Sequence, residues 1–226
     1  MSPSLHNTFA AKSFGILLFD GVEELDFVGP WEIAAMWRVY AGGPQRLTTV
    51  SVGGGRIECA KGLVVEAADS FESLPAPDFL LVPGGYAAMD LAQSSPETIA
   101  YVKHAAESAD AILSVCTGSF VLHAAGLLEG KRAATHWKAR EELSRLPGIT
   151  CANERWVQDG SVFSSAGVSA GIDMMLGFLS CVAGEEVASL VQLHAEYFPD
   201  GRAYGNAFSD VVGPPGYFDK LKGPAQ

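Results

Sequence analysis

The sequence has few basic residues. Its 226 residues include 15 lysines and arginines against 26 aspartates and glutamates, which gives a net charge of -11. Beyond the pair Lys131 and Arg132 no basic cluster stands out, so the electrostatic footprint of nucleic-acid binding is missing. No apolar run reaches the length of a membrane span. We therefore expect a protein that binds neither nucleic acids nor membranes.

Paired cysteines and nucleotide-binding motifs are also lacking. No two of the four cysteines form a CxxC pair, and the first twelve residues lack the apolar core of an export signal. These features argue for reduced thiols in a cytoplasmic protein and against a structural zinc site. The glycines at 53–55 lack the GK[ST] ending of a phosphate loop. We expect neither a metal ion nor an organic cofactor.

The composition predicts one large domain. Hydrophobic residues make up 48% of the chain, which is enough to build a sizeable core. The polar residues 1–12 are predicted to be a disordered tail. Residues 13–200 form the predicted α/β domain, and the stretch 201–226, rich in glycine and proline, is a predicted tail or arm over a partner subunit.

Apolar strands alternate with helical patterns along the domain. Continuous apolar runs at 14–19, 47–52, 78–82 and 111–115 are typical of strands buried on both faces of a parallel sheet. Residues 56–68 predict a hairpin arm with a turn at Lys61 and Gly62. Helices are expected at 31–40, 96–108, 117–128, 138–146 and 184–197. A further apolar helix is expected to end at 181. The predicted fold is α/β, a flavodoxin-like three-layer sandwich with a mostly parallel central sheet.

The most informative stretch is the strand at 111–115, which meets Cys116 and turns at once into a helix. A nucleophile on such a turn lies at a helix N-terminus, where unpaired amides and the helix dipole stabilise a thiolate. Ser114 and Gly118 supply the small neighbours that a sharp nucleophile elbow needs. The alternative is that Cys116 is a small buried hydrophobic residue.

Asp26 is a second candidate. The proline at position 30 suits a first helical turn, so we expect Asp26 in a loop between the first strand and a helix at 31–40. Ligands of open α/β sheets bind at that edge. Between Leu25 and Phe27, the carboxyl is a candidate for a pKa raised by desolvation. The alternative is a helix-capping aspartate on the surface.

Two further stretches follow predicted strands. Gly84 and Gly85 end the strand at 78–82, and their amides, with that of Thr117, are candidates for an oxyanion site beside Cys116; an ordinary turn is the alternative. His136 is expected at the end of a short strand, as a base, a hydrogen-bonding neighbour or a helix cap. Asp173, near the start of an apolar helix, is expected to interact with the helix dipole.

Four motifs in one order resemble the ThiJ/PfpI superfamily of class I glutamine amidotransferase-like proteins, and within it the branch of isonitrile hydratases. They are LLFDGVEELDFVGPWE, LLVPGG, SVCTGSFVLHAAGLLEGKRAATHW and SAGVSAGIDMML. The resemblance implies that Cys116 is an acidic, oxidation-prone thiol, that Asp26 lies over it, and that Gly85 supplies an oxyanion amide. Thr117 stands where protease-like members carry a catalytic histidine, which argues against a peptidase.

The resemblance further implies a lyase that hydrates an isonitrile to a formamide, with Cys116 as nucleophile and Asp26 as acid and base. Thr117 would orient water or Asp26, and His136 would bind substrate. Candidates for lining the pocket are Trp31, Trp137 and Tyr86. The alternatives are a glyoxalase or deglycase, which would need a histidine engaged with the cysteine, and a redox sensor based on Cys116. A homodimer is expected.

Overall fold

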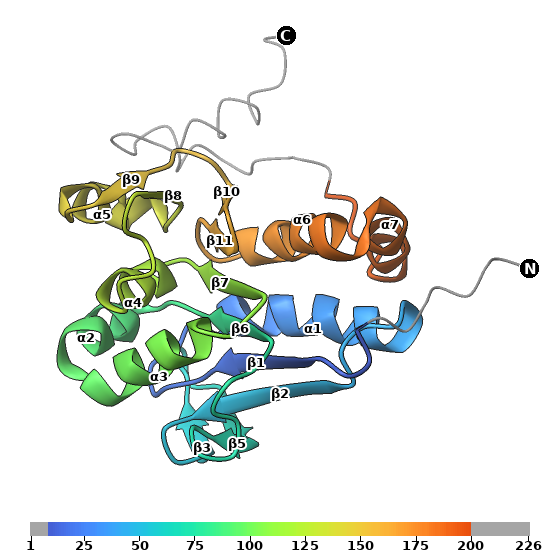
Figure 1. Cartoon of the computed structure of the whole chain (residues 1–226), viewed down its shortest axis with the longest axis horizontal. Coiled ribbons are helices and arrows are strands. Elements are labelled where there is room, and N and C mark those ends of the chain that lie inside the picture. The colour runs from blue at the N-terminus through green and yellow to red at the C-terminus, as the bar shows by residue number, and fades with distance from the viewer. Residues whose placement is uncertain (1–8, 200–226) are drawn as a thin grey trace, which may run out of the picture.

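A seven-stranded sheet forms the centre of the protein. The computed structural model describes residues 9–199, and Figure 1 shows the sheet between two layers of helices. All neighbouring strands are parallel except β10 and β11. In spatial order the strands are β10 (Trp156–Asp159), β11 (Val162–Ser165), β7 (Ala111–Val115), β6 (Phe79–Val82), β1 (Ser13–Leu17), β2 (Arg46–Ser51) and β5 (Asp69–Ser70). The predicted α/β fold with a mostly parallel sheet is confirmed.

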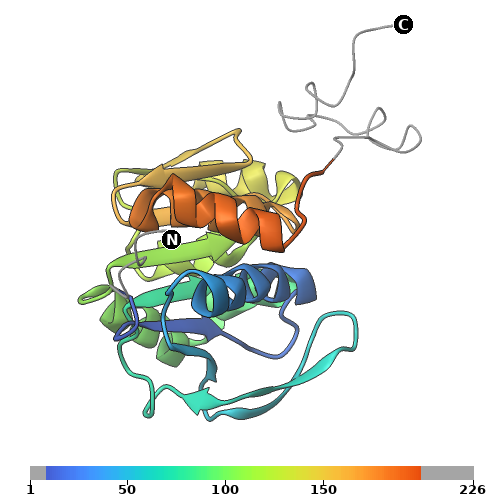
Figure 2. The ribbon, with the colours of Figure 1, turned by 90° about the vertical axis from the view of Figure 1, so that its right-hand side faces the viewer.

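The helices divide into two groups. Helices α1 (Glu24–Tyr40), α6 (Ala170–Ala183) and α7 (Glu185–His194) pack against one another on one face of the sheet (Figure 2). Helices α2 (Tyr86–Ser94), α3 (Pro96–Ala106) and α4 (Gly118–Ala124) pack together on the other face. This covering of both faces explains why the central strands β1, β6 and β7 are almost entirely apolar.

An aromatic cluster fills the core between the sheet and the helical layer that contains α1 and α6. Phe14 and Phe79 from neighbouring strands lie with ring centroids 5.9 Å apart. Phe178 of α6 meets Phe79 edge-on at 5.3 Å and Trp37 of α1 at 6.2 Å. Such edge-to-face pairs contribute about 0.5–1.5 kcal/mol each beyond the area they bury. The cluster thereby fixes the two helices against the sheet.

Two small sheets flank the main one. Strands β3 (Gly55–Glu58) and β4 (Val64–Ala67) form the predicted antiparallel hairpin. Strands β8 (Lys131–Ala133) and β9 (Ile149–Cys151) pair in parallel, and a 3₁₀ turn η1 (Trp137–Ala139) and helix α5 (Arg140–Arg145) connect them. Each of these two small sheets is close in sequence to residues that line the pocket described below.

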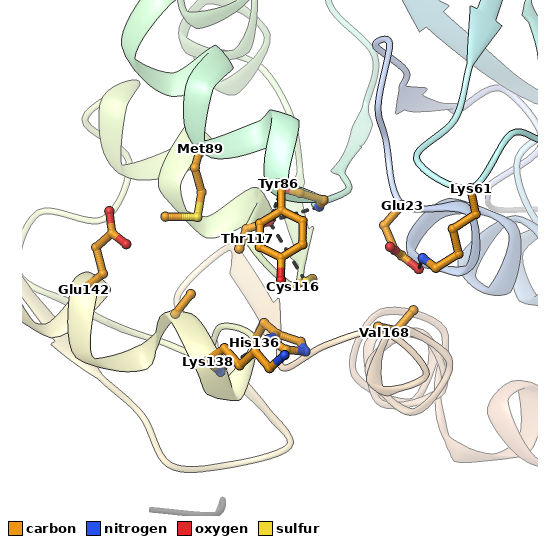
Figure 3. Close-up of a pocket in the computed structure, with 12 residues that line it drawn as sticks. Glu23, Lys61, Tyr86, Met89, Cys116, Thr117, His136, Lys138, Glu142 and Val168 are labelled. Atoms are coloured by element: carbon orange, nitrogen blue, oxygen red, sulfur yellow. Dashed lines mark hydrogen bonds and ion pairs between the residues drawn. The ribbon is translucent and has the colours of Figure 1, made fainter. Parts of the chain in front are cut away.

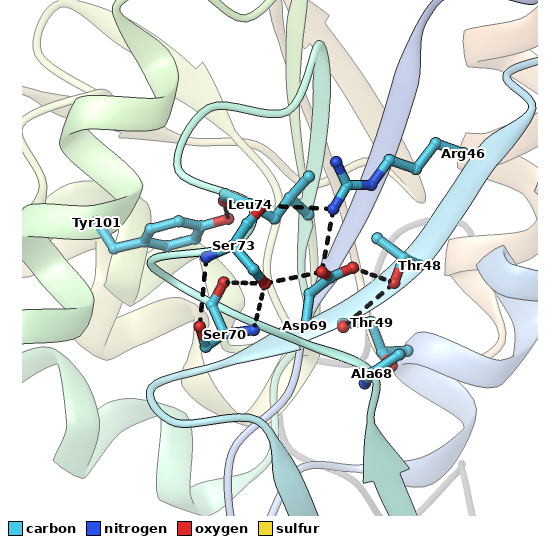
Figure 4. Close-up of polar contacts among 9 residues, drawn as sticks. All are labelled: Arg46, Thr48, Thr49, Ala68, Asp69, Ser70, Ser73, Leu74 and Tyr101. Carbon is cyan, nitrogen blue, oxygen red and sulfur yellow. Dashed lines mark hydrogen bonds and ion pairs between the residues drawn. The ribbon is translucent and has the colours of Figure 1, made fainter.

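The edge strand β5 is held by a polar network around Asp69 (Figure 4). The Asp69 carboxylate accepts hydrogen bonds from Thr48 at 2.7 Å, Ser73 at 2.8 Å and Arg46 at 3.0 Å. The Thr48 hydroxyl, followed by Ser73 and Arg46, keeps the pKa of Asp69 below its usual value. These side-chain bonds fix a strand that has only two residues in the sheet.

Two predicted helix boundaries were wrong, and one helix was not predicted. Helix α1 begins at Glu24 and contains Pro30, so Asp26 lies in its first turn and not in a loop. The buried residues Phe27, Pro30, Ile33 and Trp37 form one helical stripe, whose burial offsets the hydrogen bond that proline cannot donate. Helix α4 ends at Ala124, short of the predicted 128. Helix α2, which no prediction covered, begins directly after Gly85.

The two predicted tails lie largely outside the described residues. Nothing is described for 1–8 or for 200–226. Within the predicted N-terminal tail, however, Phe9 packs edge-on against Trp37 at 4.9 Å between ring centroids, and Lys12 forms ion pairs with Asp78 and Asp110, both at 2.9 Å. The packed part of the chain therefore includes residues before Ser13.

Candidate active site

The candidate site lies where three central strands end. In spatial order, β2, β1, β6, β7 and β11 follow the flavodoxin-like pattern, in which the strand order reverses between β1 and β6. Asp26 follows β1, Gly84 and Gly85 follow β6, and Cys116 follows β7. Ligands of such sheets bind at this reversal, outside the carboxyl ends of the strands.

Cys116 occupies a strained turn. Its φ is +57°, a left-handed conformation that residues other than glycine rarely adopt. The turn is fixed from both sides: the Cys116 amide donates to the Ser165 carbonyl at 3.1 Å, and the Cys116 carbonyl accepts from the Thr135 hydroxyl at 2.9 Å. A Cβ at Gly118 would lie 2.2 Å from the Val82 carbonyl oxygen, so the position after the turn must remain glycine.

Asp26 lies fully buried beside this cysteine. Its Oδ2 accepts the Gly84 amide at 2.9 Å, and the Cys116 thiol lies close enough to favour the charged form of the carboxyl and lower its pKa. Its Oδ1 is buried with no partner among the described residues. Burial, followed by the charge of Glu23, raises the pKa of Asp26 to about 8, against the lowering effect of the Gly84 amide. The carboxyl therefore retains a proton near neutral pH.

The predicted acidic thiol does not match the geometry. Burial and the neighbouring Asp26 charge raise the pKa of Cys116, although the Thr117 and Gly85 amides and the Thr117 hydroxyl act in the opposite direction. The sulfur belongs to a residue only 6% exposed, so desolvation outweighs the helix N-terminus. Asp26 and Cys116, hereafter the dyad, interact directly and lose protons in two steps, the first near pH 8.

Gly84, Gly85 and Thr117 join the β6 turn to the cysteine turn. The Gly85 amide donates to the Thr117 hydroxyl at 3.0 Å, and that hydroxyl donates to the Gly85 carbonyl at 2.7 Å. A Cβ at Gly84 would lie 2.5 Å from the Thr117 nitrogen. The Gly84 amide, expected to face a ligand, instead holds Asp26, and the Thr117 hydroxyl is engaged with Gly85 and lies 4.0 Å from the Cys116 sulfur.

A pocket of about 550 Å³ opens above Cys116 (Figure 3). The sequence prediction included five of the residues around it: Gly85, Tyr86, Cys116, Thr117 and His136. It missed seven, because they come from distant elements that only the fold brings together: Glu23, Lys61, Met89, Lys138, Ala139, Glu142 and Val168. The aromatic residues Trp31 and Trp137, also predicted to line it, are not among the described lining residues.

The wall beside α1 carries an ion pair between Glu23 and Lys61. Lys61 lies in the turn of the β3–β4 hairpin. Its backbone amide also donates a hydrogen bond to the Glu24 carboxylate at 2.6 Å. The only sequence signals for this contact were the acidic pair before α1 and the predicted hairpin turn, and neither specifies that the two meet.

His136 caps the short η1 turn. Its Nδ1 accepts the Lys138 amide at 3.3 Å, and no hydrogen bond to Cys116 is present among the described residues. Burial, followed by the Lys138 charge, lowers the pKa of His136, so the ring is neutral near pH 7. Of the roles considered for His136, the hydrogen bond to the Lys138 amide supports that of a helix cap.

Asp173 lies in the first turn of α6, as predicted, and is bonded to other side chains. Its Oδ2 accepts from Arg155 Nε at 2.7 Å and from the Tyr197 hydroxyl at 3.0 Å. Among residues 9–199, no group of three or more His, Cys, Asp or Glu side chains is arranged to hold a metal ion. None of the helices in the same range is long and apolar enough to cross a membrane.

Comparisons with known proteins agree with this geometry. A model of the DJ-1/PfpI family matches residues 12–180. An isonitrile hydratase of Pseudomonas putida is 36% identical over 84% of this chain and 80% of its own length. A deglycase of Thermococcus kodakarensis is 26% identical over 66% of this chain and 87% of its own. The crystal structure of a ThiJ/PfpI family protein from Pseudomonas syringae is similar with a TM-score of 0.80 and 27% identity, covering 92% of this chain and 84% of that one.

Proposed function

Because the chain belongs to the DJ-1/PfpI family, we propose that it is a lyase of the isonitrile hydratase type, which adds water to an isonitrile and releases an N-substituted formamide. The proposal is supported by the similarity to the Pseudomonas putida isonitrile hydratase and by the dyad. In this reaction Cys116 is the nucleophile, and Asp26 is the acid and the base.

The observation that carries the proposal is that the acid and the nucleophile meet at one point. The terminal carbon of an isonitrile accepts both new bonds, one to sulfur and one to hydrogen. An acid that lies beside the nucleophilic sulfur suits such an addition, since the two groups act on the same atom. Addition to a carbonyl instead needs the proton at the oxygen, one bond away from the carbon that sulfur attacks.

The proposed cycle balances its protons within the dyad. The Asp26 carboxylate first takes the Cys116 thiol proton, and the sulfur then attacks the terminal carbon while Asp26 donates that proton to the same carbon, forming a thioimidate. The Asp26 carboxylate takes a proton from water as the water oxygen adds to the carbon, and returns it to the nitrogen. Asp26 then takes the hydroxyl proton, the C–S bond breaks, and the formamide leaves with the dyad restored.

The alternatives are less well supported by the site. A glyoxalase or deglycase of this family would need a histidine engaged with Cys116, and His136 instead accepts the Lys138 amide. A sensor would need a thiolate in the resting protein, whereas burial raises the pKa of Cys116 and leaves a thiol that loses its proton only to Asp26. Assays with methylglyoxal and with peroxide, run beside the isonitrile assay, distinguish the three functions.

The first prediction is a pH profile. Below pH 8 both members of the dyad are protonated and Asp26 cannot take the thiol proton; above pH 8 Asp26 is ionised, and the pair still holds the one proton to be donated. We expect kcat/KM for methyl isonitrile to rise with pH around an apparent pKa of about 8, set by the buried Asp26. Steady-state rates from pH 5.5 to 9.5 measure it. A profile that is flat or falls across this range contradicts the assigned acid.

The second prediction concerns assembly, since we propose that the protein is a homodimer. Leu25 and Val28 lie one turn apart on α1, each 40% exposed, and Leu63, 45% exposed, follows closely after Lys61, whose amide bonds to the neighbouring Glu24. We expect light scattering to give twice the 23.8 kDa mass of one chain, and Val28→Glu to give monomers. Val39→Glu, at the other end of α1, is the control. A monomeric wild type would refute the proposal.

A further inference from the structure

Tyr86 is the most exposed large apolar side chain at the pocket, 80% accessible although it lies at the candidate site. In Figure 3 its ring projects from the start of α2 across the opening above Cys116 and Thr117. A single exposed aromatic residue elsewhere on a surface needs no explanation, but one that lines the pocket of a reactive cysteine provides contact area to a ligand.

The backbone that carries Tyr86 is tightly held. Gly85 has a φ of +117°, and both its amide and its carbonyl are bonded to the Thr117 hydroxyl. A Cβ at Gly85 would lie 2.7 Å from the Gly21 carbonyl oxygen, so this position must remain glycine. The ring therefore leaves a fixed anchor next to the nucleophile, and rotation about its own side-chain bonds is enough to bring it over a ligand.

Met89 extends the wall that Tyr86 begins. It lies three residues further along α2 and therefore on the same side of the helix, while Ala88 between them is fully buried. Met89 also packs against the small cluster of Phe120, Ala139 and Leu143, which fixes its position. Together Tyr86 and Met89 form a phenol-and-thioether wall along one side of the pocket.

The opposite side of the pocket offers another flat ring. His136 lines it, and its ring lies against Gly167, where a Cβ would come within 2.1 Å of the imidazole. The neutral imidazole, the phenol ring and the thioether all form favourable contacts with aromatic ligands. A planar group placed between these walls would contact a ring on each side.

We infer that Tyr86 is a specificity-determining residue, which covers the substituent of the bound isonitrile and favours aromatic isonitriles over small alkyl ones. The inference rests on the proposed function and adds the substrate class to it. It assigns Tyr86 no role in proton transfer, because Asp26 is fully buried and the Tyr86 side chain is exposed.

The test compares benzyl isonitrile with methyl isonitrile. For Tyr86→Ala we expect KM for benzyl isonitrile to rise roughly tenfold and KM for methyl isonitrile to change less than about threefold, since methyl has little surface for the ring to cover. Tyr86→Phe keeps the ring and is expected to behave nearly as the wild type. Tyr40→Ala removes an exposed tyrosine that stacks on His194, and serves as the control for loss of a surface ring.

Binding is measured separately from turnover in the Cys116→Ala variant. Calorimetry with benzyl isonitrile is expected to give a roughly tenfold weaker Kd when Tyr86→Ala is added. Equal losses for both isonitriles, or no loss for benzyl isonitrile, would overturn the role of Tyr86 and leave the hydratase function standing if methyl isonitrile is still turned over. A wild type that hydrates neither isonitrile refutes the proposed function, and the calorimetric comparison then decides the role of Tyr86 alone.

Discussion

Cys116→Ala is expected to lower kcat/KM for isonitrile hydration by at least about a thousandfold, because the variant has no atom that can form the covalent thioimidate. The residual activity of the variant should be almost independent of pH, since no thiol remains to be deprotonated. Formation of N-methylformamide from methyl isonitrile, followed by proton NMR, measures it.

The fold should tolerate this substitution. Cysteine and alanine both carry a Cβ, so the left-handed turn with φ of +57° is equally strained in the two proteins. Cys181→Ala is the matched control, because Cys181 is exposed on α6 and its thiol donates a hydrogen bond to the Gln158 side chain at 3.3 Å. If Cys116→Ala keeps more than a tenth of the activity, Cys116 is not the nucleophile.

Asp26→Asn is the second prediction with a large effect, and it changes activity and stability in opposite directions. An asparagine of nearly the same shape can accept the Gly84 amide as Asp26 does, but it cannot donate a proton to carbon or take one from water. General acid–base catalysis contributes about 10²–10⁴-fold, and we expect a loss of kcat of that order. The rise of kcat/KM near pH 8 should disappear with it.

The stability effect follows from the raised pKa of Asp26. Its folded-state pKa of about 8 lies above the ordinary value of 3.8, so burial disfavours the charged form, and the stability contributed by the neutral form is lost as pH rises through that interval. Asparagine does not titrate. Near pH 6 the variant should be more stable by on the order of 3 kcal/mol, at about 1.4 kcal/mol per pKa unit.

Urea denaturation at pH 4, 6 and 8 measures this difference. The free energy of unfolding of Asp26→Asn should approach that of the wild type at pH 4 and exceed it increasingly up to pH 8. Glu129→Gln, a substitution of a carboxylate outside the pocket, is the control for general charge effects. A stability difference that does not depend on pH would mean that Asp26 is not held neutral by burial.

Local patterns were sufficient to predict the parts of the site that depend on neighbours in sequence. The apolar run before Cys116, with Ser114 and Gly118 around it, predicted the sharp strand-to-helix turn, and the structure has that turn. The hairpin around Lys61 was likewise predicted from alternation and a turn pair. Both features are governed by steric rules that act within a few residues.

Other features depend on burial, which the sequence does not specify. Proline suggested a helix start at 31, but the buried stripe that begins at Phe27 extends α1 back to Glu24. The thiol was expected to be acidic because of its helix N-terminus, yet burial, followed by the neighbouring Asp26, has the larger effect on its pKa. A local dipole is outweighed when the same fold removes water from the sulfur.

The most direct test of the account is formamide production from methyl isonitrile by the wild type, Cys116→Ala and Asp26→Asn side by side at pH 8. The dyad mechanism predicts N-methylformamide from the wild type and almost none from either variant, with all three proteins folded. A wild type that makes no formamide, or a variant that makes it at the wild-type rate, would contradict the central claim that Asp26 and Cys116 act together on one carbon.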